Sequence, residues 1–382
     1  MRAPLRAKSH KAKEALACGS NVNRKIKILQ IGPYPPPGTG WSIRIKMLKK
    51  YLERAGHECL VMNTNKNRKV ASEEFVPVRG GWDYFKKVVR CCAQGYLVHV
   101  HINGKSTKSP MLALVAEFVS LLFGRRAVLT FHAGVKQDYF PKQDKFWLDN
   151  TFRLIFLFAK KIVCNNEEVK ARIAAYGVEP QKIVPIPAFC LEYLEDKAEL
   201  PPELADFIRA HQPTLCSYIY MRHDFNLDFV FEAMQRVLQH WPQLGIVWMG
   251  ADRESQALQQ RLREAGLAYC SYIAGDLDHG DFLAVLEACD AYVRTPVVDG
   301  VSSSVLEALM LGSVVVASEN GSRPEGVKTY VDGNVESFSQ TLLNIPRATN
   351  GKPEIDKPGL ARRWGVRDTL REEIELLCSA AN

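Results

Sequence analysis

The chain has 382 residues, of which 47% are hydrophobic and 24% charged, and its formal net charge is +8. This is the composition of a globular protein, and the length is enough for two domains that each bury a core, which excludes a fibrous or disordered chain. The positive charge favours anionic partners such as phosphates, nucleic acid or anionic lipid, and no apolar run reaches the roughly 18–20 residues of a membrane span.

The first part of the chain is predicted to be a doubly wound α/β domain over residues 25–187. Residues 1–24 are basic and lack the apolar stretch of a signal peptide, so we expect a solvated extension. Short apolar runs then alternate with helical patterns, as parallel βαβ units require. The expected strands are residues 26–31, 58–63, 97–102, 127–131, 162–165 and 183–186, and the expected helices include 42–55, 110–123 and 167–176.

The second part repeats this pattern over residues 213–345, after a proline-rich and acidic stretch, 188–212, that predicts a linker. The expected strands are 215–220, 245–249, 271–274, 291–294 and 314–317, and the expected helices are 227–239, 253–265, 281–289 and 303–311. Residues 346–382 form a tail that ends in a helical pattern and could pack on the first domain. The predicted fold is therefore α/β, with two tandem Rossmann-like sheets that face a cleft and bind ligands outside the carboxyl ends of their strands.

The ten cysteines include no C-x-x-C pair. Zinc sites need paired ligands at such spacings, so the sequence predicts buried thiols in a reducing compartment and no metal site. His99 and His101 share one face of a predicted strand, and we expect them to pack there rather than to bind a metal.

The strongest functional candidate is the segment RTPVVDGVSSSVLEALMLGSVVVAS. Ser302, Ser303 and Ser304 are candidates to begin a helix that follows a predicted strand. The free N–H groups at such a helix start form an anion site that suits a diphosphate. Glu307, one turn into the helix, offers two acceptor oxygens to a ribose diol, and Asp299 in the loop can accept from sugar hydroxyls. On spacing alone, both acids could instead only cap and decorate the helix start.

The loop GPYPPPGTGW, between the first predicted strand and its helix, is a second candidate. Prolines stiffen it, and Gly38 and Gly40 permit close approach of the backbone to a ligand. It lacks the third glycine of a dinucleotide fingerprint, and it is also compatible with a purely structural turn. His132 is the third candidate, because it follows an apolar strand and so lies at a carboxyl end, although a lone histidine there can also be structural.

Together these segments resemble the family 4 retaining glycosyltransferases of the GT-B fold. That family carries two acids separated by seven residues and then an E-A-L/M-x-x-G-x-P-V-V-A-S-like stretch, similar to Asp299, Glu307 and EALMLGSVVVAS. The first loop is similar to the family's G-x-Y-P-P-x-x-G-G, and the loop around Gly321 is similar to its G-G-x-P-E. The chain departs from the family with Asp299 in place of Glu, Ser313 in place of Pro and Ser322 in place of Gly.

The resemblance implies roles for these positions. Asp299 and Glu307 would contact the donor and, with His132 beside the transferring sugar, would form the catalytic set. Gly38 and Gly40 would belong to a loop on the acceptor side, in the first domain.

One part of the family's pattern is missing. The family has G-R-x…K-G after the first strand of its second domain, where Arg and Lys hold the diphosphate, but this chain has SYIYMRHDFNLDFVFEA. Arg222 is the nearest cation, and a guanidinium suits bidentate phosphate contact. The donor nucleotide is therefore assigned to Arg222, Ser302, Ser303, Ser304, Glu307 and Gly321. The missing pair leaves open a weakened or non-catalytic member that only binds the nucleotide-sugar.

The resemblance further implies transfer with retention, without a metal or other cofactor, from a UDP- or GDP-sugar to a glycan or lipid-linked acceptor in the biosynthesis of cell-surface polysaccharide or lipopolysaccharide. It implies a cytoplasmic protein, peripheral at the inner face of the membrane, that does not bind nucleic acid. The cations of a membrane-docking surface could be Lys46, Lys49, Lys50, Lys86, Lys87 and Arg90, or these could simply be solvated. Two other enzyme classes share the architecture: a nucleotide-sugar epimerase, and a nicotinamide-dependent oxidoreductase, whose G-x-G-x-x-G is missing here.

Overall fold

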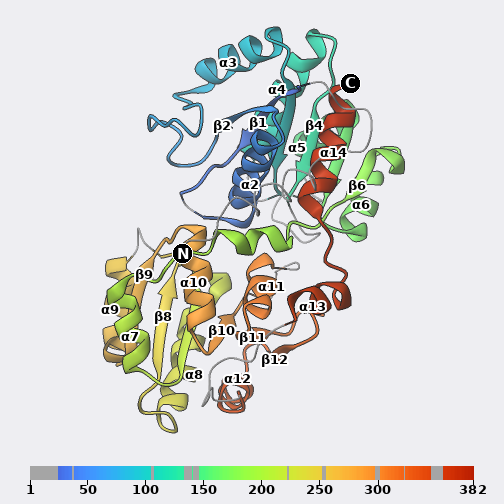
Figure 1. Ribbon diagram of the computed structural model, residues 1–382. Coiled ribbons are helices and arrows are strands. Elements are labelled where there is room, and N and C mark those ends of the chain that lie inside the picture. The colour runs from blue at the N-terminus through green and yellow to red at the C-terminus, as the bar shows by residue number, and fades with distance from the viewer. Residues whose placement is uncertain are drawn as a thin grey trace, which may run out of the picture. The chain divides into compact units, whose positions relative to one another are not determined.

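The computed structural model describes residues 25–36, 38–104, 107–132, 140, 146–221, 223–251, 255–296, 302–321, 323–345 and 356–382. The chain divides into two compact units, and each is described by itself (Figure 1). The first comprises residues up to Pro35, Trp41–Ala188 and Asp368–Asn382, and the second comprises Pro36–Gly40 and Phe189–Arg367. The predicted extension over residues 1–24 lies outside the described residues, as do Asp299 and Arg222.

The first unit is built on a six-stranded parallel sheet with the order β2-β1-β3-β4-β5-β6. Its strands are β1 Lys27–Gly32, β2 Glu58–Asn63, β3 Leu97–Ile102, β4 Val128–Phe131, β5 Lys161–Cys164 and β6 Ile183–Pro185. Its helices are α2 Gly40–Arg54, α3 Gly81–Ala93, α4 Lys108–Leu122, α5 Phe146–Phe158, α6 Glu167–Ala174 and, from the end of the chain, α14 Thr369–Ala381, with the short 3-10 helix η1 Pro180–Lys182. The parallel order follows from the alternation of short apolar runs and helices.

The two faces of this sheet differ in chemistry because successive side chains of a strand point to opposite faces. One face is apolar and packs with α3, α4, α5 and α6 in a single hydrophobic cluster that includes Leu29, Ile31, Val98 and Val100. The other face carries buried polar residues, which are Gln30, His99, His101 and Thr130. Gln30 donates to the Ile45 carbonyl of α2 and Thr130 donates to Glu373 of α14, so these two helices cover the polar face (Figure 1).

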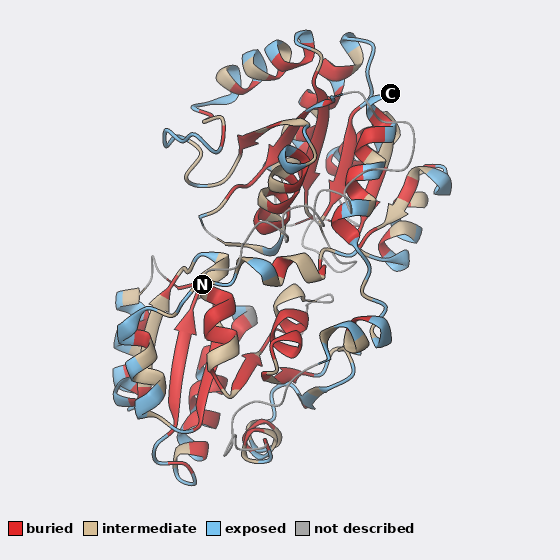
Figure 2. Cartoon of the chain, in the orientation of Figure 1, coloured by how far each residue is buried: buried red, intermediate tan, exposed pale blue. Residues whose placement is uncertain are grey.

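The second unit is built on another six-stranded parallel sheet, with the order β12-β11-β10-β7-β8-β9. Its strands are β7 Thr214–Tyr218, β8 Gly245–Met249, β9 Ser271–Gly275, β10 Ala291–Arg294, β11 Val314–Ser318 and β12 Val327–Tyr330. Its helices are α7 Pro202–Ala210, α8 Leu227–Leu238, α9 Ser255–Glu264, α10 His279–Ala288, α11 Ser303–Met310, α12 Val335–Leu343 and α13 Lys357–Arg363, with the 3-10 helices η2 Leu191–Asp196, η3 His223–Phe225 and η5 Ala268–Cys270. The inner strands of both sheets are buried, whereas the edge strands β9 and β12 of the second sheet are only partly buried (Figure 2).

Two segments differ from their predicted form. Residues 188–212 are not an open linker, because η2 and α7 pack on the second unit and bury Leu204 in its core. The tail is divided between the units: α14 belongs to the first, in keeping with the expectation that the final helix packs there, whereas α13 belongs to the second. Strand β12 was not predicted, because its sequence, VKTY, is short and half exposed and therefore lacks an apolar run.

The nine cysteines of the described residues are buried and form no disulfide. None of the helices within those residues is sufficiently long and apolar to cross a bilayer. Each sheet has one point where the strand order reverses, between β1 and β3 in the first unit and between β7 and β10 in the second. Loops that leave neighbouring strands in opposite directions open a crevice at such a point.

Candidate functional site

In the second unit, helix α11 follows β10, one of the two strands between which the strand order reverses. Ser302 precedes the helix with extended backbone, but its side chain makes no capping hydrogen bond to the helix among the described residues. Its Oγ instead lies 2.8 Å from Ser304 Oγ, which lies 2.9 Å from Tyr292 Oη. The amides at the start of α11 are therefore not capped by this serine, and a helix start of this kind attracts an anion.

Glu307 lies one turn into α11 and is only 3% exposed. Its Oε1 is 2.9 Å from Nε2 of His279, the first residue of α10. The carboxylate is thus buried, and a histidine holds one of the two oxygens that the sequence suggested for a ribose diol. Oε2 has no hydrogen-bond partner within the described part of the chain, which leaves it as the acceptor for a ligand. Sequence reasoning missed His279, because nothing in its local pattern links it to Glu307.

The loop that carries Gly38 and Gly40 belongs to the second unit, although the sequence suggested an acceptor-side loop of the first domain. The Gly38 N–H donates to Asp276 Oδ1 over 3.4 Å, and the Gly38 carbonyl lies 3.2 Å from Tyr218 Oη. A Cβ built on Gly40 would lie 3.6 Å from Oγ of Ser303, at the start of α11. The loop therefore rests on residues that follow or end β7 and β9, beside the candidate anion site.

Gly321 is part of the turn that follows β11, and its backbone conformation stabilises that turn. Its φ of +76° lies in the left-handed region that favours glycine. Its N–H donates to Glu319 Oε1 over 2.7 Å, and this hydrogen bond is the largest cause of the lowered pKa of Glu319. The Gly321 amide is therefore occupied within the turn, and a nucleotide would have to replace Glu319 to use it.

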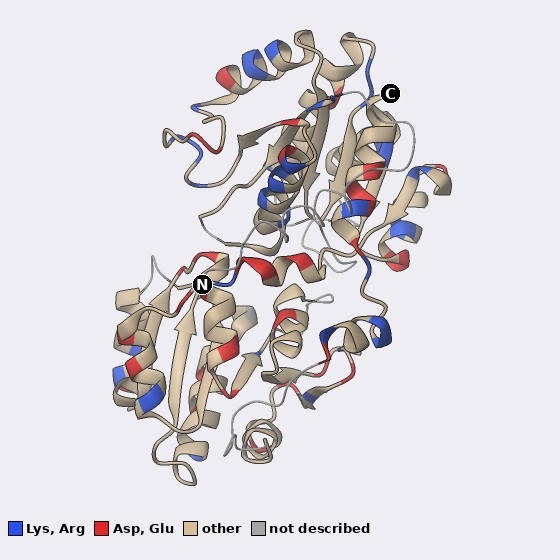
Figure 3. Cartoon of the chain, viewed as in Figure 1, with Lys and Arg blue, Asp and Glu red and all other residues tan. Residues whose placement is uncertain are grey.

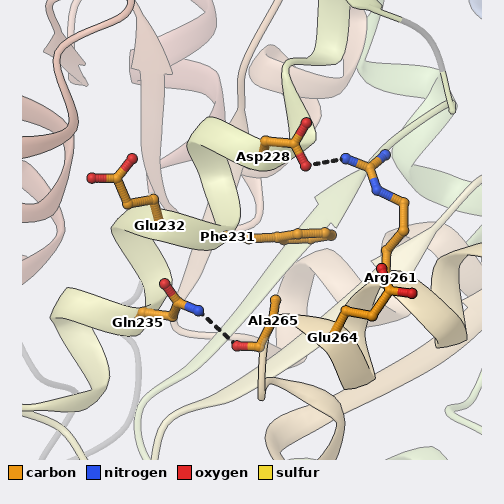
Figure 4. A pocket seen from close by; sticks show the side chains of 7 residues that line it. All are labelled: Asp228, Phe231, Glu232, Gln235, Arg261, Glu264 and Ala265. Atoms are coloured by element: carbon orange, nitrogen blue, oxygen red, sulfur yellow. Dashed lines mark hydrogen bonds and ion pairs between the residues drawn. The ribbon is translucent and has the colours of Figure 1, made fainter.

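A small pocket on the outer surface of the second unit lies between α8 and α9 (Figure 4). Its lining residues are Asp228, Phe231, Glu232, Gln235, Arg261, Glu264 and Ala265. Arg261 pairs with Asp228 and lies over the Phe231 ring, 5.4 Å from its centroid. Three acids and one already paired cation do not suit a diphosphate, so this pocket is not the donor site.

In the first unit, His132 follows β4, as predicted, and is half-buried. Its N–H donates to the Ile102 carbonyl at the end of β3, over 2.8 Å. Its ring stacks on His101 at a centroid distance of 5.2 Å and lies 5.9 Å from the ring of Trp41. Gly32 makes this arrangement possible, because a Cβ at Gly32 would come within 3.0 Å of His101 and 2.4 Å of Ile45.

Hydrogen bonds fix which nitrogens of these histidines carry the proton. Gln30 Nε2 donates to the Ile45 carbonyl, so its Oε1 accepts from His101 Nε2–H over 3.1 Å. A neutral His101 then has a bare Nδ1, which accepts from His132 Nε2–H over 2.9 Å. Burial keeps the ring neutral, since it lowers the pKa of His132 to about 3. His132 therefore keeps a bare Nδ1, which can accept a hydrogen bond from a hydroxyl.

A second network of hydrogen bonds, which includes one ion pair, joins the polar face of the first sheet to α14. Arg44 on α2 donates from Nε to Glu373 Oε2 over 2.7 Å, and both side chains are almost completely buried. Thr130 donates to Glu373 Oε1 over 2.9 Å and accepts from His99 Nε2 over 2.7 Å. Burial raises the pKa of Glu373, but Arg44 and the neighbouring histidines outweigh it and hold the pKa below its usual range.

The sequence matches two glycosyltransferase families along most of its length. Residues 39–189 match the family described as Glycosyltransferase Family 4, and residues 215–346 match the one described as Glycosyl transferases group 1. The first range covers most of the part of the chain that forms the first sheet, and the second range covers nearly all of the part that forms the second sheet. No curated protein matches the sequence.

Several solved structures have the same fold. Anabaena Alr3699/HepE in complex with UDP-glucose is 16% identical and has a TM-score of 0.65, over 93% of this chain and 100% of that one. The lipopolysaccharide outer core galactosyltransferase WaaB is 14% identical, with a TM-score of 0.54 over 94% of this chain and 100% of that one. A Listeria monocytogenes protein assigned as a UDP-N-acetylglucosamine 2-epimerase is 14% identical, with a TM-score of 0.57 over 84% and 88%. At these identities the likeness establishes the two-sheet fold.

Proposed function

Because the chain belongs to the group 1 glycosyltransferases of the GT-B fold, we propose that it transfers a sugar from a nucleotide-sugar to a glycan or lipid-linked acceptor, with retention. The observation that carries the proposal is the start of α11, where Ser302 caps no amide among the described residues and a buried carboxylate lies one turn along the helix. A diphosphate suits the amides, and a ribose hydroxyl suits the carboxylate.

His279 adds a part that the family resemblance did not supply. Its Nε2 lies 2.9 Å from Oε1 of Glu307, and this hydrogen bond restrains the orientation of the carboxylate. We therefore assign Glu307 Oε2 to a ribose hydroxyl and His279 to the positioning of that carboxylate. Asp299 and Arg222 lie outside the described residues, and their assignment to the sugar and the diphosphate rests on the sequence alone.

In the proposed reaction, the anomeric carbon of the sugar exchanges its bond to the diphosphate for a bond to the acceptor. The bond between the anomeric carbon and the diphosphate breaks, a bond to the acceptor oxygen forms on the same face, and the acceptor proton passes to the departing phosphate. Fixed dipoles at a helix start stabilise the charge that develops on the leaving group. The first unit contributes His132, whose bare Nδ1 accepts from a sugar hydroxyl. We place the reaction on the cytoplasmic side, in the assembly of cell-surface polysaccharide or lipopolysaccharide.

Donor binding is tested by thermal shift with a panel of UDP-, GDP- and ADP-sugars, because a ligand of the native state raises its stability. We expect the UDP-sugars to give the largest shift, since UDP-glucose occupies the related Anabaena structure. The absence of a shift with every nucleotide-sugar would contradict the proposal. A shift without nucleotide release, with or without acceptors, would identify a binding protein.

Two further measurements separate the mechanism from its alternatives. An epimerase would convert the donor sugar without an acceptor, whereas we expect nucleotide release to depend on an added glycan or lipid-linked acceptor. We also expect transfer to continue in EDTA, because helix amides and protein cations can neutralise the diphosphate. A complete loss of transfer in EDTA that added metal reverses would show that the metal-free mechanism is wrong.

A further inference from the structure

The first unit exposes an unusual amount of apolar surface on three helices. Trp82 on α3 is 68% exposed, Leu122 on α4 is 69% exposed, and Phe146 on α5 is 83% exposed. The other large exposed apolar residues on or directly after these helices are Phe85, Met111, Val115, Phe118, Phe123, Trp147 and Leu154. Contiguous apolar surface of this kind marks an interaction site.

These residues form a continuous surface rather than scattered points. On α4, Met111, Val115, Phe118 and Leu122 follow one another at intervals of three or four residues, which places them along one stripe of the helix. Helix α4 packs against both α3 and α5, so the stripe lies between their exposed aromatic residues. The opposite stripe of α4, with Ala113, Ala116 and Val119, is already buried in the core. The outer stripe therefore has no partner within the described part of the first unit.

The charged residues around this apolar surface indicate what kind of partner binds it. The exposed cations around this surface are Lys86, Arg90, Lys108, Arg125, Arg126 and Arg153, and those on α3 are visible in Figure 3. The acids on these helices are fewer: Asp83 is paired with Lys87, Asp149 is only partly exposed, and Glu117 is buried in the core. A second copy of this face or the basic residues 1–24 would bring like charges together, whereas anionic lipid headgroups would neutralise them.

We propose that the outer face of α3, α4 and α5, which we call the lipid face, binds the surface of a bilayer that contains anionic lipid. Aromatic residues suit the boundary between headgroups and acyl chains, and the surrounding cations suit the headgroups. Lys86 shows both features, because its Nζ lies 5.3 Å from the ring centroid of Trp82. The proposal also corrects the docking surface suggested by the sequence: Lys46, Lys49 and Lys50 are on α2, on the opposite face of the sheet, and do not belong to the lipid face.

The test is co-sedimentation of the full chain with vesicles of phosphatidylcholine, alone or mixed with phosphatidylglycerol. We expect binding to the mixed vesicles and at least tenfold weaker binding by the double variant Phe118→Ser, Leu122→Ser, which removes two large apolar anchors. The matched control is Tyr269→Ser, Val331→Ser, because these residues are similarly exposed, at 69% and 61%, in the second unit. This control should bind as the wild type does. Equal binding by both double variants, or no binding of the wild type to mixed vesicles, would overturn the proposal.

A second pair of variants tests whether the cations of the lipid face contribute to vesicle binding. Arg125→Gln with Arg126→Gln should weaken binding to mixed vesicles about fivefold for each charge removed, whereas Arg362→Gln with Arg363→Gln, also adjacent and exposed in the second unit, should not. Sedimentation velocity supplies the rival outcome: a wild-type dimer that Phe118→Ser, Leu122→Ser converts to a monomer would show that the surface binds a second copy. Donor thermal shifts of all variants should match the wild type, so this test is independent of the proposed transfer activity.

Discussion

The two units each bury a glutamate beside a histidine, but they hold it in different ways. Glu373 in the first unit is 1% exposed and receives hydrogen bonds from the Arg44 guanidinium and from Thr130. Glu307 in the second unit is 3% exposed and has only His279 as a partner within the described residues. Glu373 is thus neutralised by a permanent cation, whereas Glu307 keeps an oxygen for a ligand at the start of a helix.

This difference shows that burial alone does not separate a structural acid from a functional one. A buried carboxylate whose acceptor sites are filled by the protein leaves no oxygen for a ligand, and its removal strands a buried positive charge. A buried carboxylate with one unfilled oxygen beside uncapped amides can bind a ligand that brings its own donor. The four predictions below test this contrast, from the largest expected effect to the smallest.

Glu373→Ala should lower the free energy of unfolding by about 3–5 kcal/mol, because Arg44 would remain buried without its counter-ion. Urea unfolding measures this change. Glu375→Ala is the matched control on the same helix, since Glu375 is exposed and its pair with Arg371 is on the surface. We expect that control to change stability by less than about 1 kcal/mol. Equal effects of the two variants would show that the buried pair is not what holds α14.

Glu307→Ala should lower kcat/KM for transfer about 100-fold to 1000-fold while the protein stays folded, because a preorganised contact to the donor is lost. Transfer assays with the donor found by thermal shift measure the effect. Glu307→Gln is the control that keeps the size of the side chain and an oxygen for His279, and we expect it to be folded and intermediate in activity. Near-normal transfer by Glu307→Ala would show that the donor site is assigned wrongly.

Acid should destabilise the first unit. Burial lowers the pKa of His99 to about 4, so between that value and the ordinary value near 6.5 the unfolded chain binds a proton that the folded chain does not. Stability should therefore fall as pH falls through this window, by up to about 1.4 kcal/mol per pH unit for each such histidine. The lowered pKa of Glu373 acts in the same direction below about pH 4.5.

Urea unfolding from pH 7.5 to 4.5 measures this dependence, and His99→Gln should reduce its slope. His240 is exposed and serves as the control position, so His240→Gln should leave the slope unchanged. A flat pH profile of the wild type would contradict the assignment of neutral buried histidines.

His132→Ala should lower kcat/KM about tenfold, since it removes one hydrogen bond to the sugar. His132→Asn should recover part of the loss, because the Asn oxygen can occupy the position of Nδ1, whereas His132→Gln should not. Steady-state transfer kinetics of the three variants measure this difference. Better recovery by Gln than by Asn would show that Nε2, not Nδ1, faces the substrate.

The sequence predicted most strands because each is a short apolar run between loops, as in IKILQI and GIVWM. It also located Ser303 and Glu307, which lie close together in one motif. It missed the partners that the fold brings from elsewhere: Arg44 and Glu373 are 329 positions apart, and His279 lies 28 positions before Glu307. Local sequence patterns cannot predict such pairs, because the pattern around each residue reflects only the helix to which it belongs.

The return of α14 to the first sheet has a consequence for how this protein is made. Synthesis proceeds from the N-terminus, and domains usually fold as they emerge from the ribosome. Here Arg44 is translated 329 residues before its counter-ion Glu373. We therefore expect the nascent first unit to remain incompletely folded until α14 has left the ribosome, so that the second unit, whose residues extend to Arg367, is complete first.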